Sequence, residues 1–572
     1  MAFVAAMNSP DNTKVGVNGA NVYTEEGVGD YRVSLFTMLN RGLGESYIRE
    51  YIYKIINKGN TNEIRDLFVM AFQTRDIRGG KGEKDLFYHF MNALYNRQPI
   101  IVKEMVSLIP EYGCWRDMWV IMRNIPSLEQ NILEHTYRVF SLDRAKSEGG
   151  QKSDMSLLAK WLPREGSGTY PGIARKIANY IYKDIQSARQ RIVLYRKEVS
   201  SMNKSLKTVE INMCGKEWKH IIPEAVPGRC LKNNKKAFLN QPIKERDNSI
   251  HELRYPRSED RMECRKHFLD FSRKLELGTT KAHGADVVMP HELVEHIYNN
   301  NNTNTLTTDE LNILQGQWTS IRDKTLESGG LGKCVPMCDF SGSMDGRPKL
   351  ISLALGILIS EINHPAFRDH ILTFDHEPKW HSFIGKKTVK EKVDSIGNLG
   401  QGLNTNFYKA CWKILKKMKE NKVPIGEEPS DLIVLTDMGW DDAYGVNVSS
   451  YVNGRRKDND IAQWKTQIQQ LQEDFKKVGE EVWGKGNSWK VPRIVIWNLQ
   501  AKFNDFHAKS EDEGVVVLSG WSPNLLKALQ KNGVQVMTPY EGMRTILDDE
   551  RYEPVRKLYD SIMDRFDNIL AQ

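Results

Sequence analysis

The chain has 572 residues, more than one ordinary domain holds, so we expect two or three domains. With 40% hydrophobic and 27% charged residues, it can fill hydrophobic cores, which excludes a disordered or fibrous protein. No apolar run reaches the roughly 18 residues of a membrane-spanning helix, and the first residues lack a secretory pattern. We therefore expect a soluble cytoplasmic protein with no membrane partner.

The seven cysteines are scattered and form no CxxC pair, which is typical of reduced thiols rather than of a disulfide framework. Cys334 and Cys338 are close in sequence, but no second Cys/His pair follows at a spacing suited to zinc. Two small buried residues around a strand are the favoured interpretation of this pair.

The formal net charge of +8 is concentrated in one stretch of the chain. Between Lys183 and Lys281 there are 23 Lys and Arg residues against 13 Asp and Glu residues, whereas residues 331–572 hold 33 of each kind. Such a basic stretch indicates a polyanionic partner, usually RNA or DNA, although a solvated helical surface has the same composition.

The first half of the chain has the apolar spacing of amphipathic helices. After a polar segment at 1–30, apolar residues recur every three or four positions over 31–57. Similar segments follow at 61–73, 83–96, 99–108, 115–124, 127–145, 170–210, 259–276 and 290–298. Gly, Pro and Asn breaks separate the first of these segments, so we expect an α-helical repeat module over 31–325 with HEAT-like stacked helix pairs.

Two groups of cations in this module are candidates for binding phosphates. The sequence TRDIRGGKGEK carries Arg75, Arg78, Lys81 and Lys84 around a Gly-Gly break that would expose backbone amides; a turn with solvated charges is the alternative. In the basic stretch, a predicted helix carries Arg189, Arg191, Arg196 and Lys197, and a helix would place Arg189 and Arg196 on one face.

From residue 331 the pattern changes to short runs of Val, Ile and Leu with helical segments between them. These runs are KCVPMCD, HILTFD, SDLIVLTD, VPRIVIWNL and GVVVLSG, and a final helix is expected over 541–570. Alternating buried strands and helices indicate a parallel α/β sheet covered on both faces, in a domain over 331–572. Functional residues then belong at the carboxyl ends of its strands.

Carboxylates and hydroxyls are found at those strand ends. The first strand runs into Asp339-Phe340-Ser341-Gly342-Ser343, the strand LIVLT runs into Asp437, and Thr405 lies in a Gly/Asn-rich loop before an amphipathic helix. Such hard oxygen ligands suit Mg²⁺. The alternative is a chance DxSxS motif beside ordinary helix caps.

Asp339, Ser341, Ser343, Thr405 and Asp437 resemble, in order and spacing, the metal-ion-dependent adhesion site (MIDAS) of von Willebrand factor type A domains. The resemblance implies a Rossmann-like type A domain in which these five residues hold Mg²⁺ or Mn²⁺ and leave one position for a ligand's carboxylate. The long insertion DDAYGVNVSSYVNGRRKDND after Asp437 departs from the family pattern and would partly cover the site.

The resemblance extends along most of the chain. VYTEEGVGDYRVSLFTMLNRG, IPEYGCWRDMW, DMSLLAKWLPRE, TDMGWDDA and SGWSPNLLKAL resemble a domain of unknown function, numbered 2828, found in fungi, plants, amoebae and giant viruses. That family is similar in architecture to the Ro autoantigen family, in which a helical TROVE module is closed by a type A domain. The likeness implies binding of structured or single-stranded RNA. Because the terminal repeats of a curved helical array expose apolar faces, we also expect contacts between 331–572 and the first helices near 31–57.

The sequence gives no indication of an enzyme. It has no GxSxG elbow, and HEPKWH, with His376, Glu377 and His381, lacks the HExxH spacing of a helical zinc site; a hairpin is the favoured interpretation. We therefore expect a Ro-like RNA-binding ribonucleoprotein component with a MIDAS. The alternative is a protein-interaction scaffold, a virion or assembly protein in a virus, whose metal site captures an acidic partner residue.

Overall fold

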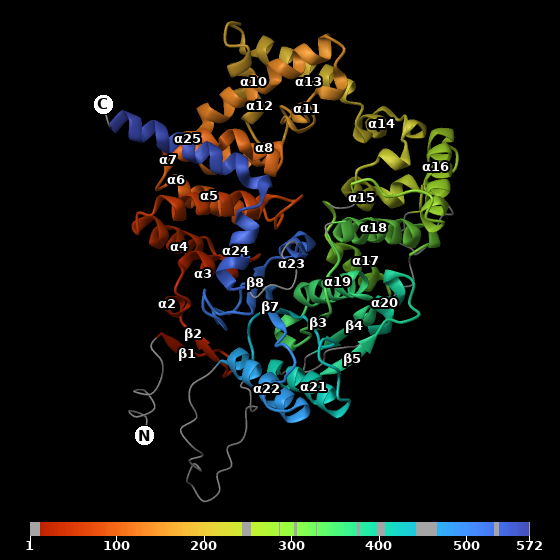
Figure 1. The fold of residues 1–572 in the computed structure, drawn as a ribbon. Coiled ribbons are helices and arrows are strands. Elements are labelled where there is room, and N and C mark those ends of the chain that lie inside the picture. Colours follow the sequence, from red (N-terminus) through yellow and green to blue (C-terminus); the bar gives the residue numbers. More distant parts are fainter. Residues whose placement is uncertain are drawn as a thin grey trace, which may run out of the picture. The chain divides into compact units, whose positions relative to one another are not determined.

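Two units, each built from several stretches of sequence, make up the chain in a computed structural model (Figure 1). The structure describes residues 12–242, 253–284, 287–301, 306–327, 329–373, 378–396, 406–441, 466–530 and 537–570. Unit 1 comprises Met1–Asp66, Val288–Leu306 and Trp318–Glu550, and unit 2 comprises Leu67–Val287, Thr307–Gln317 and Arg551–Gln572. The first 66 residues thus belong with the α/β sequence, whereas the expected domain boundary separates them from it.

Unit 1 contains a six-stranded sheet. Its strands are β3 (Cys334–Cys338), β4 (His370–Thr373), β5 (Lys379–Ser382), β6 (Asp431–Thr436), β7 (Arg493–Asn498) and β8 (Val515–Ser519), in the order β5-β4-β3-β6-β7-β8. All neighbours are parallel except β5, which forms an antiparallel hairpin with β4. The five predicted strands are confirmed, and the strand order is that of a Rossmann-like doubly wound sheet.

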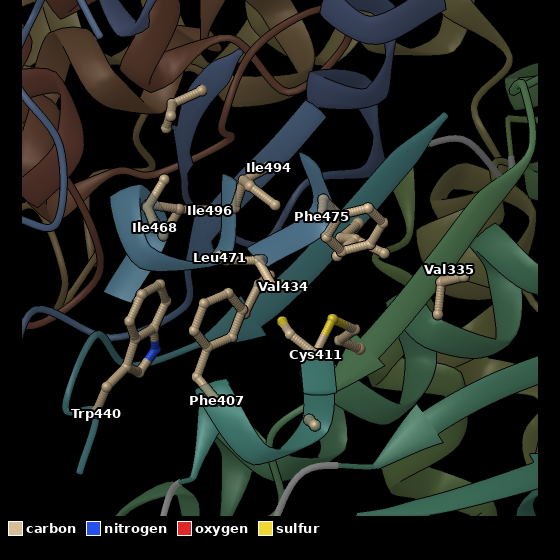
Figure 2. Packing of buried hydrophobic residues seen from close by; sticks show 14 of the residues in the cluster. Val335, Phe407, Cys411, Val434, Trp440, Ile468, Leu471, Phe475, Ile494 and Ile496 are labelled. Carbon is tan, nitrogen blue, oxygen red and sulfur yellow. The ribbon is translucent and has the colours of Figure 1, made fainter. Parts of the chain in front are cut away.

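Helices cover both faces of this sheet. On one face, α21 (Phe407–Glu420) and α22 (Gln467–Trp483) bury Phe407 and Leu471 in a cluster with Val434 of β6 (Figure 2). Successive side chains of a strand point to opposite faces. On the other face lie α19 (Arg347–Ile362), whose Gly356 lies directly against Cys338 of β3, and α24 (Pro539–Leu547), which packs on β8.

The first helices pack on the sheet of unit 1, as expected. The predicted helix over 31–57 is two helices, α3 (Tyr31–Met38) and α4 (Glu45–Asn57). In the break between them, the Asn40 side chain donates to the carbonyl of Asn498 on β7 (2.7 Å), and the Asn498 side chain donates to the carbonyl of Thr37 (2.9 Å). A buried polar pair of this kind ends α3 at the sheet.

The remaining elements of unit 1 are short. They are β1 (Thr13–Val15), β2 (Asn21–Tyr23), α2 (Glu25–Val28), α17 (Pro290–Asn301), α20 (Val389–Ile396) and α23 (Lys527–Gln530). The antiparallel pair β1-β2 lies within the segment expected to be only polar.

Unit 2 is built from helices. They are α6 (Asp85–Tyr95), α7 (Pro99–Met105), α8 (Ile109–Tyr112), α9 (Trp115–Asn124), α10 (Glu129–Glu148), α11 (Leu158–Trp161), α12 (Ile173–Ile181), α13 (Ala188–Leu206), α14 (Val209–Gly215), α15 (Gly228–Phe238), α16 (Glu259–Glu276) and α25 (Glu553–Leu570). Helices α5 (Thr61–Arg75) and α18 (Thr308–Glu327) run from one unit into the other. No helix in the described ranges is both long and apolar enough to cross a membrane.

The single helix expected over 541–570 is wrong, because the chain breaks after α24 and restarts at α25. At the break, Arg551 and Tyr552 both bind the buried carboxylate of Asp76, with Arg551 Nη2 2.8 Å from Oδ1 and the Tyr552 hydroxyl 3.2 Å from Oδ2. These residues and α25 belong to unit 2. An ion pair to a distant helix therefore ends the helix that local sequence would continue.

Candidate functional site

The candidate site lies at the carboxyl edge of the sheet in unit 1. Strands β3 and β6 are parallel neighbours in register, with Cys338 opposite Leu435. The residues that follow them therefore leave the sheet side by side, and the Asp339 amide still donates to the carbonyl of Leu435 (3.0 Å). This register places Asp339 beside Thr436, the last residue of β6, and Asp437 directly follows Thr436.

Hydrogen bonds fix the loop after β3 around the Asp339 carboxylate. Oδ1 accepts from the backbone amide of Ser341 (2.9 Å), and Oδ2 accepts from the hydroxyl of Thr436, the last residue of β6 (2.9 Å). A turn of 3₁₀ helix over Gly342–Met344 then brings the hydroxyls of Ser341 and Ser343 to 3.0 Å from each other. Asp339 and Ser341 are completely buried.

The second carboxylate, Asp437, is also buried. Its Oδ1 accepts from the amide of Gly439 (3.1 Å). Its Oδ2 has no partner with hydrogen-bond geometry among the described residues, although the Ser343 hydroxyl is close enough to favour the ionised carboxylate. Between them, Met438 has a left-handed backbone with φ of 75°, so the chain turns sharply at this point.

The two carboxylates raise each other's cost of ionisation. Burial first, and then the charge of Asp437, raise the pKa of Asp339 to about 7. Burial also raises the pKa of Asp437. Two adjacent acids held in a dry site favour either protonation or a bound cation.

A ring stack and the N-terminal segment support the loop that follows Asp437. The imidazole of His507 bonds the carbonyl of Met438 through Nε2 (2.8 Å) and stacks on the indole of Trp440, with ring centroids 3.7 Å apart. Burial lowers the pKa of His507 to about 4, so the ring is neutral at physiological pH. From the N-terminal side, the Asn18 amide donates to the carbonyl of Gly439 (2.8 Å).

The donors fit a hard divalent cation. The two carboxylates of Asp339 and Asp437 and the two hydroxyls of Ser341 and Ser343 are the kind of oxygen ligands that Mg²⁺ prefers, and Mg²⁺ keeps several waters. Within the described part of the chain, no group of three or more His, Cys, Asp or Glu side chains is placed to hold a metal, so hydroxyls and water must complete any shell here. Thr405, the remaining residue of the predicted set, lies outside the described residues, as does the insertion at 442–465.

The four cations of TRDIRGGKGEK do not gather on a surface. Arg75 is buried against Asp117, with Nε 2.8 Å from Oδ2, and Lys81 is completely buried. Arg78 donates to the carbonyl of Glu111 (3.3 Å), and with Lys84 it is exposed. The four cations therefore do not form the expected phosphate nest. They belong to a folded turn in which Arg75 and Lys81 are buried in unit 2.

The cations predicted on a helix of the basic stretch are on α13, but they differ in exposure. Arg189, Arg196 and Lys197 are exposed, and Arg196 Nη1 lies 3.7 Å from a carboxylate oxygen of Glu165. Arg191 is half-buried, and its guanidinium bonds its own surroundings, with Nε donating to the carbonyl of Ile185 (2.6 Å). Three of these four candidates thus face solvent.

The described part of the suspected HEPKWH site, residues 378–381, leads into and lies on β5, which pairs with β4 as the favoured hairpin interpretation expects. His381 lies on β5 and bonds the Ser395 hydroxyl through Nε2 (3.2 Å), while His376 and Glu377 lie outside the described residues. All seven cysteines are free thiols, and Cys334 and Cys338 are buried at the two ends of β3.

Sequence reasoning missed Thr436, which orients Asp339, and His507, which supports the loop after Asp437. Thr436 directly precedes Asp437 at the end of a strand, and this position alone marks it as a neighbour of Asp339. Nothing near His507 in the sequence indicates its contact with the carbonyl of Met438, 69 residues earlier.

The chain is similar to a domain family and to a viral protein, both of which are described as uncharacterised. Residues 333–562, which include the whole candidate site, match a family model described as a domain of unknown function (DUF7788). The chain is also similar to Uncharacterized protein L728 of Acanthamoeba polyphaga mimivirus, with 25% identity over 564 residues that cover 94% of this chain and 88% of the viral protein. The chain therefore resembles an uncharacterised domain family and, over most of its length, an uncharacterised protein of a giant virus.

Proposed function

We propose that unit 1 is a non-enzymatic binding module that uses a divalent cation to capture an acidic group of a partner. The observation that supports this proposal is the buried Oδ2 of Asp437, which has no hydrogen-bond partner in the described residues although a second buried carboxylate lies at the same sheet edge. Leaving a buried carboxylate oxygen without a partner is costly, and a bound cation would remove that cost.

Each residue has a distinct part in this proposal. Asp339 is oriented by the Ser341 amide and the Thr436 hydroxyl, so its carboxylate cannot rotate freely. Ser341 and Ser343 present a pair of hydroxyl oxygens, and Asp437 presents its Oδ2. Mg²⁺ or Mn²⁺ held by these oxygens would supply an open coordination position for a carboxylate, as the resemblance to a MIDAS implies.

Binding of Mn²⁺ followed by electron paramagnetic resonance tests the cation site. The parent chain should bind one ion, and Asp339→Ala should bind none while remaining folded by circular dichroism. Asp345→Asn is the matched control, because Asp345 lies in the same loop with a side chain 73% exposed. A Glu-rich peptide, but not its Gln-rich counterpart, should then displace water from the bound Mn²⁺. Equal ion binding by parent and Asp339→Ala would refute the site.

We propose as a second function that the chain is an RNA-binding ribonucleoprotein component. The observation that favours it is the exposure of Arg189, Arg196 and Lys197 on α13, within a stretch that carries 23 basic and 13 acidic residues. Phosphate contacts supply most of the affinity of such surfaces, so binding should be strongly salt-dependent. The test is titration of the full chain with fluorescent RNA at roughly 50 and 200 mM salt. Absence of binding at the lower concentration would leave only the scaffold function.

A further inference from the structure

A groove in unit 2 joins a loop to one side of α16. The loop consists of two short 3₁₀ turns over Trp218–His220 and Pro223–Ala225. The groove has a volume of about 790 Å³ and is lined by residues 219–224 and by α16 side chains between Lys266 and Lys274. All of these residues belong to the basic stretch of the chain.

The walls of the groove are held in place by contacts behind it. The backbone amide of Lys219 donates to Oδ1 of Asp260 in the first turn of α16 (2.9 Å). The guanidinium of Arg261 lies 3.7 Å from the ring centre of Trp218, and Trp218 also packs edge-on against Phe238. The loop is thus fixed to the helix by contacts that leave the groove itself open.

Cations outnumber carboxylates in this groove. Its lining contains four Lys or Arg side chains and two carboxylates, Glu224 and Asp270. Both carboxylates pair with the same lysine, with Lys274 Nζ 2.8 Å from Asp270 and 3.6 Å from Glu224. Across the described ranges, Lys219 and Arg273 have no ion pair, and Lys266 has only an exposed neighbour on its own helix at 3.8 Å.

The spacing of these cations suits a chain of phosphates. Lys266 and Arg273 are seven residues apart on one face of α16, which corresponds to about 10 Å along the helix axis. A single phosphate cannot contact both, whereas a nucleic acid strand carries one charge about every 3.4 Å along its duplex axis. Among the described residues, no Trp, Tyr or Phe side chain lines the groove, and its rings are the imidazoles of His220 and His267.

We infer that this groove binds the sugar-phosphate backbone of structured RNA, reading shape and charge rather than sequence. The inference rests on the proposed RNA-binding function, and it places the main contact on α16 and residues 219–224 rather than on α13. Stacking on Trp, Tyr or Phe rings is the usual means of holding single strands, and the described lining offers only the smaller imidazoles of His220 and His267, which favours paired RNA.

Fluorescence anisotropy with an RNA duplex of about 16 base pairs tests the inference on the full chain. The variant Lys219→Gln/Arg273→Gln removes one cation from each wall; both side chains are exposed, so folding should be retained. We expect about tenfold or greater loss of affinity at roughly 50 mM salt, and a fall of about 2 in the slope of log affinity against log salt. Lys386→Gln/Lys387→Gln, two exposed lysines of unit 1, is the control with the same charge change.

The outcomes separate the groove from the general function. If the parent binds no RNA, the RNA-binding function and the groove are both refuted. If the parent binds but the groove variant binds equally well, or if Arg189→Gln/Lys197→Gln causes the larger loss, the function stands and the groove is refuted. A phosphorylated peptide that binds the parent more tightly than the duplex would also overturn the assignment to RNA.

Discussion

Substituting Asn for Asp437 should stabilise the metal-free protein and abolish its stabilisation by Mg²⁺. An asparagine at this position keeps the oxygen that accepts from Gly439, and it removes a buried charge whose second oxygen has no partner in the described residues. Few substitutions at a binding site are expected to increase stability, so the sign of the effect is diagnostic.

The structure sets the size of the effect. The pKa of Asp339 is raised from 3.8 to about 7, which corresponds to roughly 4 kcal/mol between its two protonation states. Burial is the largest cause of this shift and the charge of Asp437 the second, whereas hydrogen bonds from Ser341 and Thr436 lower the pKa. The charge of Asp437 thus accounts for one part of this energy, and we expect Asp437→Asn to raise the free energy of unfolding by about 2 kcal/mol in chelator at pH 8, where Asp339 is largely ionised.

Urea denaturation with and without Mg²⁺ measures both parts of the prediction. At a concentration one hundred times its Kd, Mg²⁺ should stabilise the parent by about 2.7 kcal/mol and the variant by none. Asp345→Asn makes the same change of charge at an exposed side chain of the same loop, and it should behave as the parent in both buffers.

Two results would refute the reasoning. A loss of more than about 1 kcal/mol for Asp437→Asn in chelator would mean that the Asp437 charge is already satisfied in the folded protein. Equal stabilisation of parent and variant by Mg²⁺ would mean that the ion binds elsewhere on the chain.

Three further predictions concern packing in unit 1. Burial lowers the pKa of His507 from 6.5 to about 4, so the parent should lose stability as pH falls below 6.5. Between about pH 7.5 and 5, the free energy of unfolding of the parent should fall by roughly 2 kcal/mol more than that of His507→Gln, as measured by urea titration. A side chain at Gly356 would overlap Cys338 Sγ, so Gly356→Ala should lower the free energy of unfolding by about 1–3 kcal/mol. Adding Cys338→Ala to the same chain should restore most of the lost stability, as measured by thermal melting. Asn498→Ala leaves the carbonyl of Thr37 without its donor and should cost about 1–3 kcal/mol, whereas an unchanged urea midpoint would show that water replaces the amide.

The sheet and the metal loop could be predicted because their signals are local. Buried parallel strands consist of continuous Val, Ile and Leu runs, and each of the five runs became a strand. Carboxyl ends of parallel strands meet at one sheet edge, so Asp339 and Asp437 had to be neighbours once β3 and β6 were adjacent. The strand order itself depends on long-range pairing that no local pattern gives.

Helix boundaries failed where distant residues decide them. The apolar spacing over 31–57 continues through residues 39–44, but Asn40 bonds the carbonyl of Asn498, 458 positions away, and the helix stops. Likewise, Arg551 and Tyr552 bind Asp76 across more than 470 positions, and the expected C-terminal helix divides there. In both cases a buried polar contact outweighs the local helical preference.

Counting charge along the sequence located the basic stretch but not the cations that remain available in it. Arg191 is used by backbone carbonyls, and Lys274 is shared between two carboxylates, although both count equally in the net charge. Lys219 and Arg273 are 54 positions apart in sequence and line the same groove only because residues 219–224 fold against α16. A polyanion is attracted by the cations that the fold leaves without an ion pair, and these follow from tertiary packing rather than from composition.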